Sequence, residues 1–204
     1  MKRFLALLLA LVCAFSLFSC NNGGGTETPG DNDNEPTLAE KIAAFTAAID
    51  ATNPTGAVIN VTYVTDEYTL ASVLNASYKQ DGAAEITGEV EKLGQIGESF
   101  IVKVPVAVSV SADGAITSGD DTLGSAEAAA SLKLNLDAAK LVDAKVESGV
   151  LFAKVYTADT ASVLGVALGS TANISVVMAN GKVTSFVVEY FDGDNKVTVA
   201  CAYN

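Results

Sequence analysis

Hydrophobic residues recur at two different spacings along this chain, and each change of spacing marks a new element. The first periodic stretch follows Thr37 and Glu40, which stand at the spacing of a capping box. Its apolar residues fall at helical intervals before Asn53-Pro54 interrupts the pattern: Leu38, Ile42, Phe45 and Ile49. The pattern predicts an amphipathic helix from about residue 38 to 51.

From Val58 the period becomes two, which is typical of half-buried strands. Apolar residues alternate with polar ones up to Tyr78, a turn is expected at Gln80-Asp81-Gly82, and the alternation resumes through Ile86 and Val90. The longest one-sided strand runs from Phe100 to Val110. Because Pro105 cannot donate a ladder hydrogen bond, we expect this strand to lie at an edge or to be bulged there.

The second half of the chain predicts a strand from Val146 to Tyr156 and then a short helix. That helix spans Ala158 to Leu168, with Gly169 placed as its C-cap. Three closing strands are expected at about 172–179, 182–191 and 196–203, and Asn180-Gly181 gives the strongest hairpin signal. Together the patterns predict an α+β fold, in which two helices pack on one face of a strongly curved antiparallel sheet.

The N-terminus has the pattern of a secretory signal. Lys2-Arg3 precede a short apolar run that ends at Leu17-Phe18-Ser19-Cys20. This resembles the lipobox of bacterial lipoproteins, in which the cysteine is acylated and becomes the new N-terminus, although Phe18 departs from the usual small or aliphatic residue. An ordinary cleaved signal and an uncleaved apolar anchor are the alternatives.

We therefore expect three parts: a signal peptide over residues 1–19, lipidated Cys20 with a flexible linker over 20–36, and one domain over 37–204. The linker contains no aliphatic residue from Asn21 to Pro36, so it cannot bury apolar surface. Its acidic run, Asp31 to Glu35, lacks the glycine and the distant glutamate of a calcium loop, which favours a solvated linker.

Composition excludes most catalytic sites. The chain has no His and no Trp, and Arg3 is its only Arg. Catalytic triads, zinc sites with His ligands and bidentate Arg clamps are therefore impossible in the mature chain, and no metal or cofactor is expected. Cys201 alternates with apolar residues and is interpreted as a buried hydrophobe.

Charge also limits the partners. The chain carries 12 basic and 24 acidic residues, and loss of Lys2 and Arg3 leaves 10 against 24, or −14. An acidic chain repels phosphate backbones, so no nucleic acid is expected as a partner, and the anchor rather than charge would hold the protein to a membrane. Paired carboxylates at Asp120-Asp121 or at Glu89 and Glu91 leave an enzyme as the weakest alternative.

The C-terminal third carries a resemblance to a known family. Its motifs are Glu147 to Val155 with a Ser-Gly step, Ala161 to Gly165, Ile174 to Val176 with Gly181 to Val183, and the ending Thr198 to Tyr203. In this order the chain resembles the half-barrel lipoproteins of the mycobacterial LppX and LprG type, which share a fold with the carriers LolA and LolB.

The resemblance implies a half-barrel with an apolar cavity for the acyl chains of a lipid or glycolipid. The candidate lining residues are the apolar side chains expected to point inward: Phe100, Val102, Val104, Val106, Val108, Phe152, Leu164, Ile174, Phe186 and Tyr190. An ordinary packed core is the alternative for each of them.

Two functions remain open for the mature domain. The first is a non-catalytic, extracytoplasmic lipoprotein that is anchored to the bacterial cell membrane and binds a hydrophobic ligand. The second is an anchored module that contacts proteins or surface polymers and has a fully packed core. A contiguous exposed apolar patch would favour the second.

Overall fold

The structure is a computed structural model that describes residues 36–81, 83–94, 101–111, 115–119, 121–125 and 134–204. The predicted signal peptide, Cys20, nearly all of the linker and Phe100 lie outside the described residues. None of the helices within these ranges is long and apolar enough to cross a bilayer.

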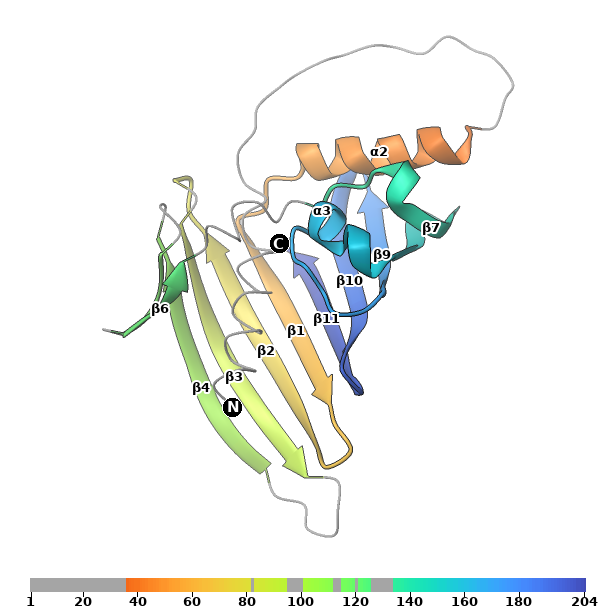
Figure 1. The fold of residues 1–204 in the computed structure, drawn as a ribbon. Coiled ribbons are helices and arrows are strands. Elements are labelled where there is room, and N and C mark those ends of the chain that lie inside the picture. Colours follow the sequence, from red (N-terminus) through yellow and green to blue (C-terminus); the bar gives the residue numbers. More distant parts are fainter. Residues whose placement is uncertain (1–35, 82, 95–100, 112–114, 120, 126–133) are drawn as a thin grey trace.

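A single antiparallel sheet of eleven strands dominates the described fold (Figure 1). The strands follow the spatial order β6-β5-β4-β3-β2-β1-β11-β10-β9-β8-β7. The first six strands are β1 (Gly56–Val64), β2 (Tyr68–Tyr78), β3 (Ala84–Gly94), β4 (Ile101–Val110), β5 (Ala115–Ser118) and β6 (Asp121–Ser125). The last five are β7 (Leu141–Glu147), β8 (Val150–Val155), β9 (Ala172–Ala179), β10 (Lys182–Asp192) and β11 (Asn195–Tyr203).

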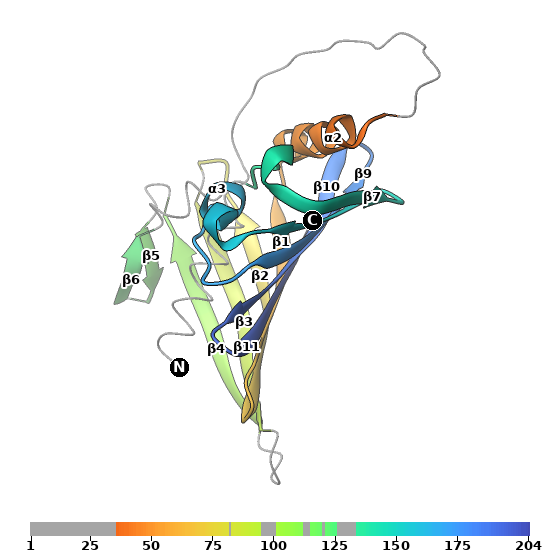
Figure 2. The same cartoon turned by 45° about the vertical axis from the view of Figure 1, so that its right-hand side comes forward.

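The sheet consists of two meanders that meet at the first and last strands. Every neighbouring pair is consecutive in the chain except β1 and β11, which pair from Ala57 opposite Tyr203 to Val64 opposite Lys196. Figure 2 shows the strand direction turning progressively from β4 to β7, so the sheet is twisted. With its helices on one face, the open sheet gives an α+β fold.

Helix α2 spans Leu38–Ala51 and begins with the capping box that the sequence contains. The Thr37 N–H donates to Glu40 Oε2 at 2.7 Å, and the Glu40 N–H donates to Thr37 Oγ1 at 3.3 Å. The backbone N–H and the hydroxyl of Thr37 both donate to the Glu40 carboxylate, the hydroxyl at 2.8 Å, and these two bonds lower the pKa of that carboxyl. The helix buries Ile42, Phe45 and Ile49 and packs mainly on β10, β7 and β9.

Two hairpins in the C-terminal half turn through residues with positive φ. At Asn180-Gly181 the φ angles are 54° and 70°, and the turn lies where the sequence predicts it. Ser148 and Gly149 have φ angles of 51° and 78° and join β7 to β8. The single strand predicted from Val146 to Tyr156 is therefore wrong: it is the end of one strand, a two-residue turn and a second strand. Serine seldom adopts positive φ, so the turn signal was weak.

The second helix is shorter than predicted. A 3₁₀ turn, η3 (Thr157–Asp159), leads into α3 (Thr160–Leu164), and Gly165 with φ 72° ends it. The C-cap is therefore Gly165 and not Gly169. Thr160 explains the early stop, because its buried hydroxyl accepts a hydrogen bond from the Leu168 N–H at 3.0 Å and folds the following segment back.

Pro105 lies on an exposed edge of the sheet. Strand β4 pairs with β3 along its length, but it pairs with β5 only at Ser109 and Val110. The Ser111 N–H donates to Ala115 on the β5 side. Since backbone groups alternate sides along a strand, the Pro105 nitrogen points to the same side, where no described strand is paired with it. The prediction of an edge position is confirmed.

A glycine in β3 permits close packing of β2 against β3. A Cβ atom at Gly88 would lie 2.2 Å from the Val73 carbonyl oxygen and 3.0 Å from Leu74 Cα. Gly88→Ala is therefore expected to lower the free energy of unfolding by about 1–3 kcal/mol, because the backbone of β2 must shift.

The measurement is urea unfolding followed by circular dichroism. Gly169→Ala is the matched control: a Cβ atom there would meet nothing within 4 Å, and its effect should stay within about 0.5 kcal/mol. Equal stability of the two variants would show that β2 and β3 do not approach this closely.

Candidate functional site

The two faces of the sheet differ in chemistry. We call the face beneath α2 and α3 the inner face and the opposite face the outer face. One row of paired residues crosses the inner face from β4 to β8: Val106, Gly88, Leu74, Ile59, Cys201, Phe186, Val176 and Leu151. All but Gly88 belong to one core cluster, which also contains Phe45 of α2 and Leu164 of α3.

The predicted lining residues separate into two groups. Those buried at 8% exposure or less are Val106, Val108, Leu164, Ile174, Phe186 and Tyr190. Those that are exposed are Val102, Val104 and Phe152. The buried group forms part of the packed core, so a ligand would contact these residues only after a rearrangement.

Exposure increases along the inner face of β4. Five valines at alternate positions share this face, and their exposed fractions are 1% at Val110, 5% at Val108, 8% at Val106, 43% at Val104 and 46% at Val102. Figures 1 and 2 show the reason, because β1–β4 extend away from α2 and α3 at their lower end. The same apolar surface thus passes from the core to an open end.

Phe152 lies on the outer face, so the prediction that it points inward is wrong. The inward residues of β8 are its neighbours Leu151, Ala153 and Val155, all of them buried. Phe152 and Lys154 are two residues apart and therefore lie on the same face of β8. The centroid of the Phe152 ring lies 5.3 Å from the Lys145 ammonium. Lys154 could have indicated which face of β8 points outward, because burying a charged lysine in the core costs free energy.

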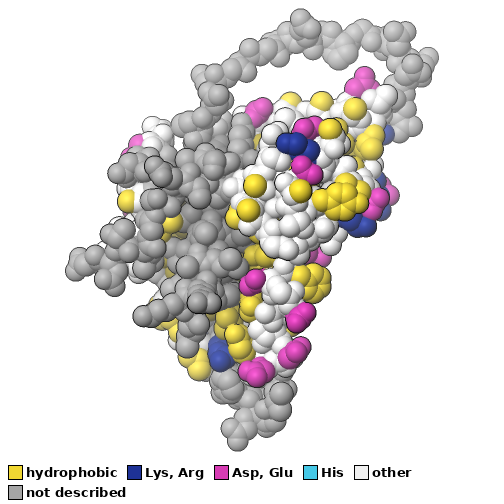
Figure 3. Space-filling model, in the orientation of Figure 1, with side chains coloured by type: hydrophobic (Ala, Val, Ile, Leu, Met, Phe, Trp, Pro, Cys, Tyr) yellow, Lys and Arg dark blue, Asp and Glu magenta, His cyan; other side chains and the backbone are white. Residues whose placement is uncertain are grey.

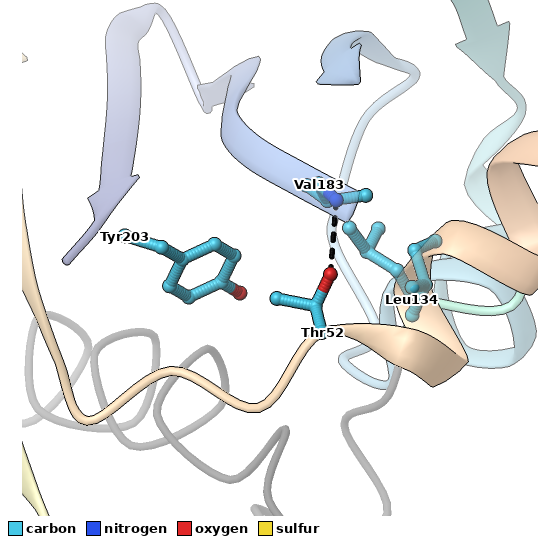
Figure 4. Close-up of a pocket in the computed structure, with 5 residues that line it drawn as sticks. Thr52, Leu134, Val183 and Tyr203 are labelled. Carbon is cyan, nitrogen blue, oxygen red and sulfur yellow. Dashed lines mark hydrogen bonds between the residues drawn. The ribbon is translucent and has the colours of Figure 1, made fainter. Parts of the chain in front are cut away.

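A recess lies where the end of α2 meets the sheet (Figure 4). It is lined by Ile49, Thr52, Leu134, Val183 and Tyr203 and measures about 180 Å³ counted out to open solvent, with no space inside that admits a water molecule. In this form it is too narrow for an acyl chain. The Thr52 hydroxyl spans it, donating to the Ala48 carbonyl at 2.6 Å and accepting from the Val183 N–H at 2.9 Å.

Tyr190 and Cys201 are titratable residues buried in the core of the C-terminal half. Tyr190 is 3% exposed, and its hydroxyl has no hydrogen-bond partner among the described residues. Burial raises the pKa of this phenol well above its usual range, and burial likewise raises the pKa of the Cys201 thiol to about 12. Both groups are therefore neutral at physiological pH, and Cys201 is not a nucleophile.

Among the described residues, the open end of the inner face of β1–β4 carries one basic side chain, that of Lys92. Lys92 pairs with Val102 on β4 and with Leu70 on β2, so it lies in the inner row next to the row of Tyr68 and Gly94. Its ammonium lies 4.3 Å from the centroid of the Tyr68 ring. The sequence contained a signal for this position, because Lys92 continues the parity of the apolar residues Ile86 and Val90.

The outer face combines ion pairs with apolar side chains, and one ion pair, Glu189 with Lys196 at 2.9 Å, lies on its central strands β10 and β11. Lys103 contacts Glu91 and Glu89 near one edge, and Lys154 contacts Asp143 at 2.7 Å near the other. Between them lies a band of half-buried and exposed apolar residues that we call the outer band: Phe152, Val150, Val177, Val187, Ala200, Ala202, Val58 and Val73. Val73 is 56% exposed.

Of the two acidic pairs, only Glu89 and Glu91 have described side chains. Glu89 and Glu91 lie on the outer face of β3 and share Lys103, with side-chain exposures of 59% and 34%. Asp120 lies outside the described residues. Within the described ranges, no group of three or more His, Cys, Asp or Glu side chains is arranged to hold a metal ion.

Comparison with known proteins finds a distant similarity to solved structures. No family model matches the sequence, and no curated protein matches it. Among solved structures the chain is similar to LprF from Mycobacterium bovis, at 13% sequence identity and a TM-score of 0.40, over 80% of this chain and 91% of that one.

The recess yields a test of how α2 is fixed to the sheet. Thr52→Val keeps the volume of the side chain but leaves the buried Val183 N–H without its acceptor. We expect the free energy of unfolding to fall by about 1–3 kcal/mol. Thr46→Val is the control, because the Thr46 hydroxyl only donates, to the carbonyls of Ile42 and Leu136 at 3.3 Å. A loss no larger than that of the control would contradict the role given to Thr52.

Proposed function

We propose that this protein is an extracytoplasmic lipoprotein, anchored to the bacterial cell membrane through Cys20, that binds a hydrophobic ligand such as a lipid or glycolipid without catalysis. The signal pattern that ends at Cys20 supports the anchor. The same proposal includes the domain division at residues 19 and 36. It also includes a sheet that curls around its ligand as a half-barrel.

The observation that carries the ligand proposal is the exposure gradient on β4. Val104 and Val102 continue the inner face of Val106 and Val108 but are exposed at 43% and 46%. Removing such surface from water is favourable, by about 1.5–3 kcal/mol for a valine that becomes fully buried. A ligand that lies on this end of the sheet extends the core rather than forming a separate site.

The absence of catalysis in this proposal rests on the sequence. The chain has no His, and Arg3 is its only Arg, so the residues that most often activate nucleophiles or clamp anions are missing. Glu89 and Glu91, which could act as acid and base, support a surface ion pair with Lys103.

The outer band supports a second candidate function, an anchored interaction module. The band crosses the sheet from β8 to β2 with Ser175 and Asn60 between its members, and it is exposed at Val73 and Phe152. Exposed apolar surface of this kind often marks contacts between proteins. On this alternative the inner face is core, and the outer band contacts another envelope protein or a surface polymer.

The anchor is tested by metabolic labelling with an alkyne-tagged fatty acid. We expect the wild-type chain to incorporate the label and Cys20→Ala to lose it, because the thiol of Cys20 is the acylated group. Cys13→Ala, inside the apolar run, is the control and should remain labelled. Label that persists in Cys20→Ala would remove the basis for an anchored protein.

The ligand site is tested with a pair of valines on opposite faces. The protein is the mature chain from residue 20 with Cys20→Ser in place of the anchor, and the probe is hexadecanol, which displaces a fluorescent apolar dye. Val104→Glu is expected to weaken binding at least tenfold, because it places a charge on the inner face.

Val73→Glu is the matched control, since Val73 is also exposed, at 56% against 43% for Val104, but lies on the outer face. The affinity of this variant should stay within twofold of wild type. Failure of the wild-type chain to bind the probe would exclude the ligand proposal. A Val73 variant that binds hexadecanol normally but loses a co-purifying envelope partner would favour the interaction module.

A further inference from the structure

We propose that the ligand is a single-chain amphiphile with an anionic head, and that Lys92 binds this head while the apolar chain lies on Val102 and Val104. This inference rests on the proposed function and names the class of its ligand. The shared chemistry is a carboxylate or phosphate head on an alkyl chain.

Position is the first argument. Lys92 is the only charged residue on the inner face of the described parts of β1–β4, where every other inner position is apolar, glycine, serine or tyrosine. Its row is the one in which Val102 is exposed. On β3 and β4 the uncharged inner face therefore becomes cationic at the end at which Val102 and Val104 are exposed, whereas Leu70 in the same row on β2 is 4% exposed.

The second argument is the distance between the basic and apolar groups. Lys92 and Val102 are direct cross-strand neighbours, so their Cβ atoms lie about 5 Å apart. Val104 and Val90 form the next inner row, about 7 Å further along the strands. An anionic head held by the ammonium thus places the first part of its chain on exposed valine side chains.

The third argument is that the ammonium is held at this face. Its contact with the Tyr68 ring, at 4.3 Å, keeps the lysine over the inner row rather than extended into solvent. A charge at the border of an apolar surface forms stronger hydrogen bonds with an ionised acceptor than with a neutral one. A carboxylate or phosphate is therefore favoured over a hydroxyl.

Acidic residues at this end of the sheet also favour one side of it for binding of the anionic head. Asp66 and Glu67 lie in the β1–β2 turn, and Asp192 and Asp194 lie at the β10–β11 turn. Figure 3 shows acidic side chains gathered at the lower right and a basic side chain among hydrophobic ones at the lower left. An anion is repelled from the β1 and β11 side and directed toward β3 and β4.

The experiment compares four probes with the same sixteen-carbon chain: palmitate, hexadecyl phosphate, hexadecanol and hexadecyltrimethylammonium. Each displaces a neutral fluorescent dye from the mature Cys20→Ser chain at pH 7.5 and low salt, below the concentration at which it forms micelles. We expect palmitate or hexadecyl phosphate to bind about tenfold more tightly than hexadecanol, and the cationic probe to bind most weakly. The relative affinity of the two anions distinguishes a carboxylate from a phosphate head.

Lys92→Gln is expected to reduce the preference for anions to within twofold while leaving the affinity for hexadecanol unchanged. Lys103→Gln is the matched control, because Lys103 lies one residue from Val102 but on the outer face, and the preference should persist. Thermal unfolding of each variant verifies that it folds.

The outcomes separate the two proposals. Binding of hexadecanol without a preference for anions, or a preference that survives Lys92→Gln, overturns the assignment of Lys92 but leaves the proposed function intact. Failure of all four probes to bind overturns both. A dimer in light scattering that dissociates in Val104→Glu would show that a second copy covers the inner face, which also overturns both.

Discussion

The pairing of β1 with β11 is the constraint on which the rest of the structure depends. It joins Ala57 to Tyr203 and Val64 to Lys196, residues at opposite ends of the domain, and turns two separate meanders into one sheet. Bringing such distant segments together costs chain entropy before any contact is gained. Burial of apolar side chains in the core offsets this cost, because the central row of the core includes Ile59 and Cys201, which face each other in this pairing.

The single sheet then determines which surfaces remain open to partners. On one side, the part of β4 that β5 leaves unpaired contains Pro105, which lacks a backbone donor. On the other side, the edge strand β7 has Asp143 with a φ of 52° and a shift in register. Both features oppose the addition of another strand. Side-chain surfaces are left for recognition: the open end of the inner face near Val104 and the outer band around Val73.

Particular residues show why prediction from the sequence was limited. The Asn180-Gly181 turn was predictable because both residues tolerate positive φ. The turn at Ser148 was not, because serine seldom adopts the positive φ that it has there. Phe152 was placed on the wrong face, since a one-residue slip in register reverses every side chain of a strand. The sequence does not identify Gly165 as the C-cap in place of Gly169, because the hydrogen bond that folds the chain back joins Thr160 and Leu168, which are eight residues apart.

Local chemistry therefore determined the elements that depend on neighbouring residues. The capping box at Thr37, the Asn180-Gly181 hairpin and the edge position of Pro105 all follow from residues a few positions apart. Tertiary structure alone decided that the chain's first and last strands pair, that valines of identical pattern on β4 range from buried to exposed, and that Lys92 lies beside the exposed ones. The reason is that exposure depends on how far the helices reach across the sheet, and a periodic sequence carries no record of that distance.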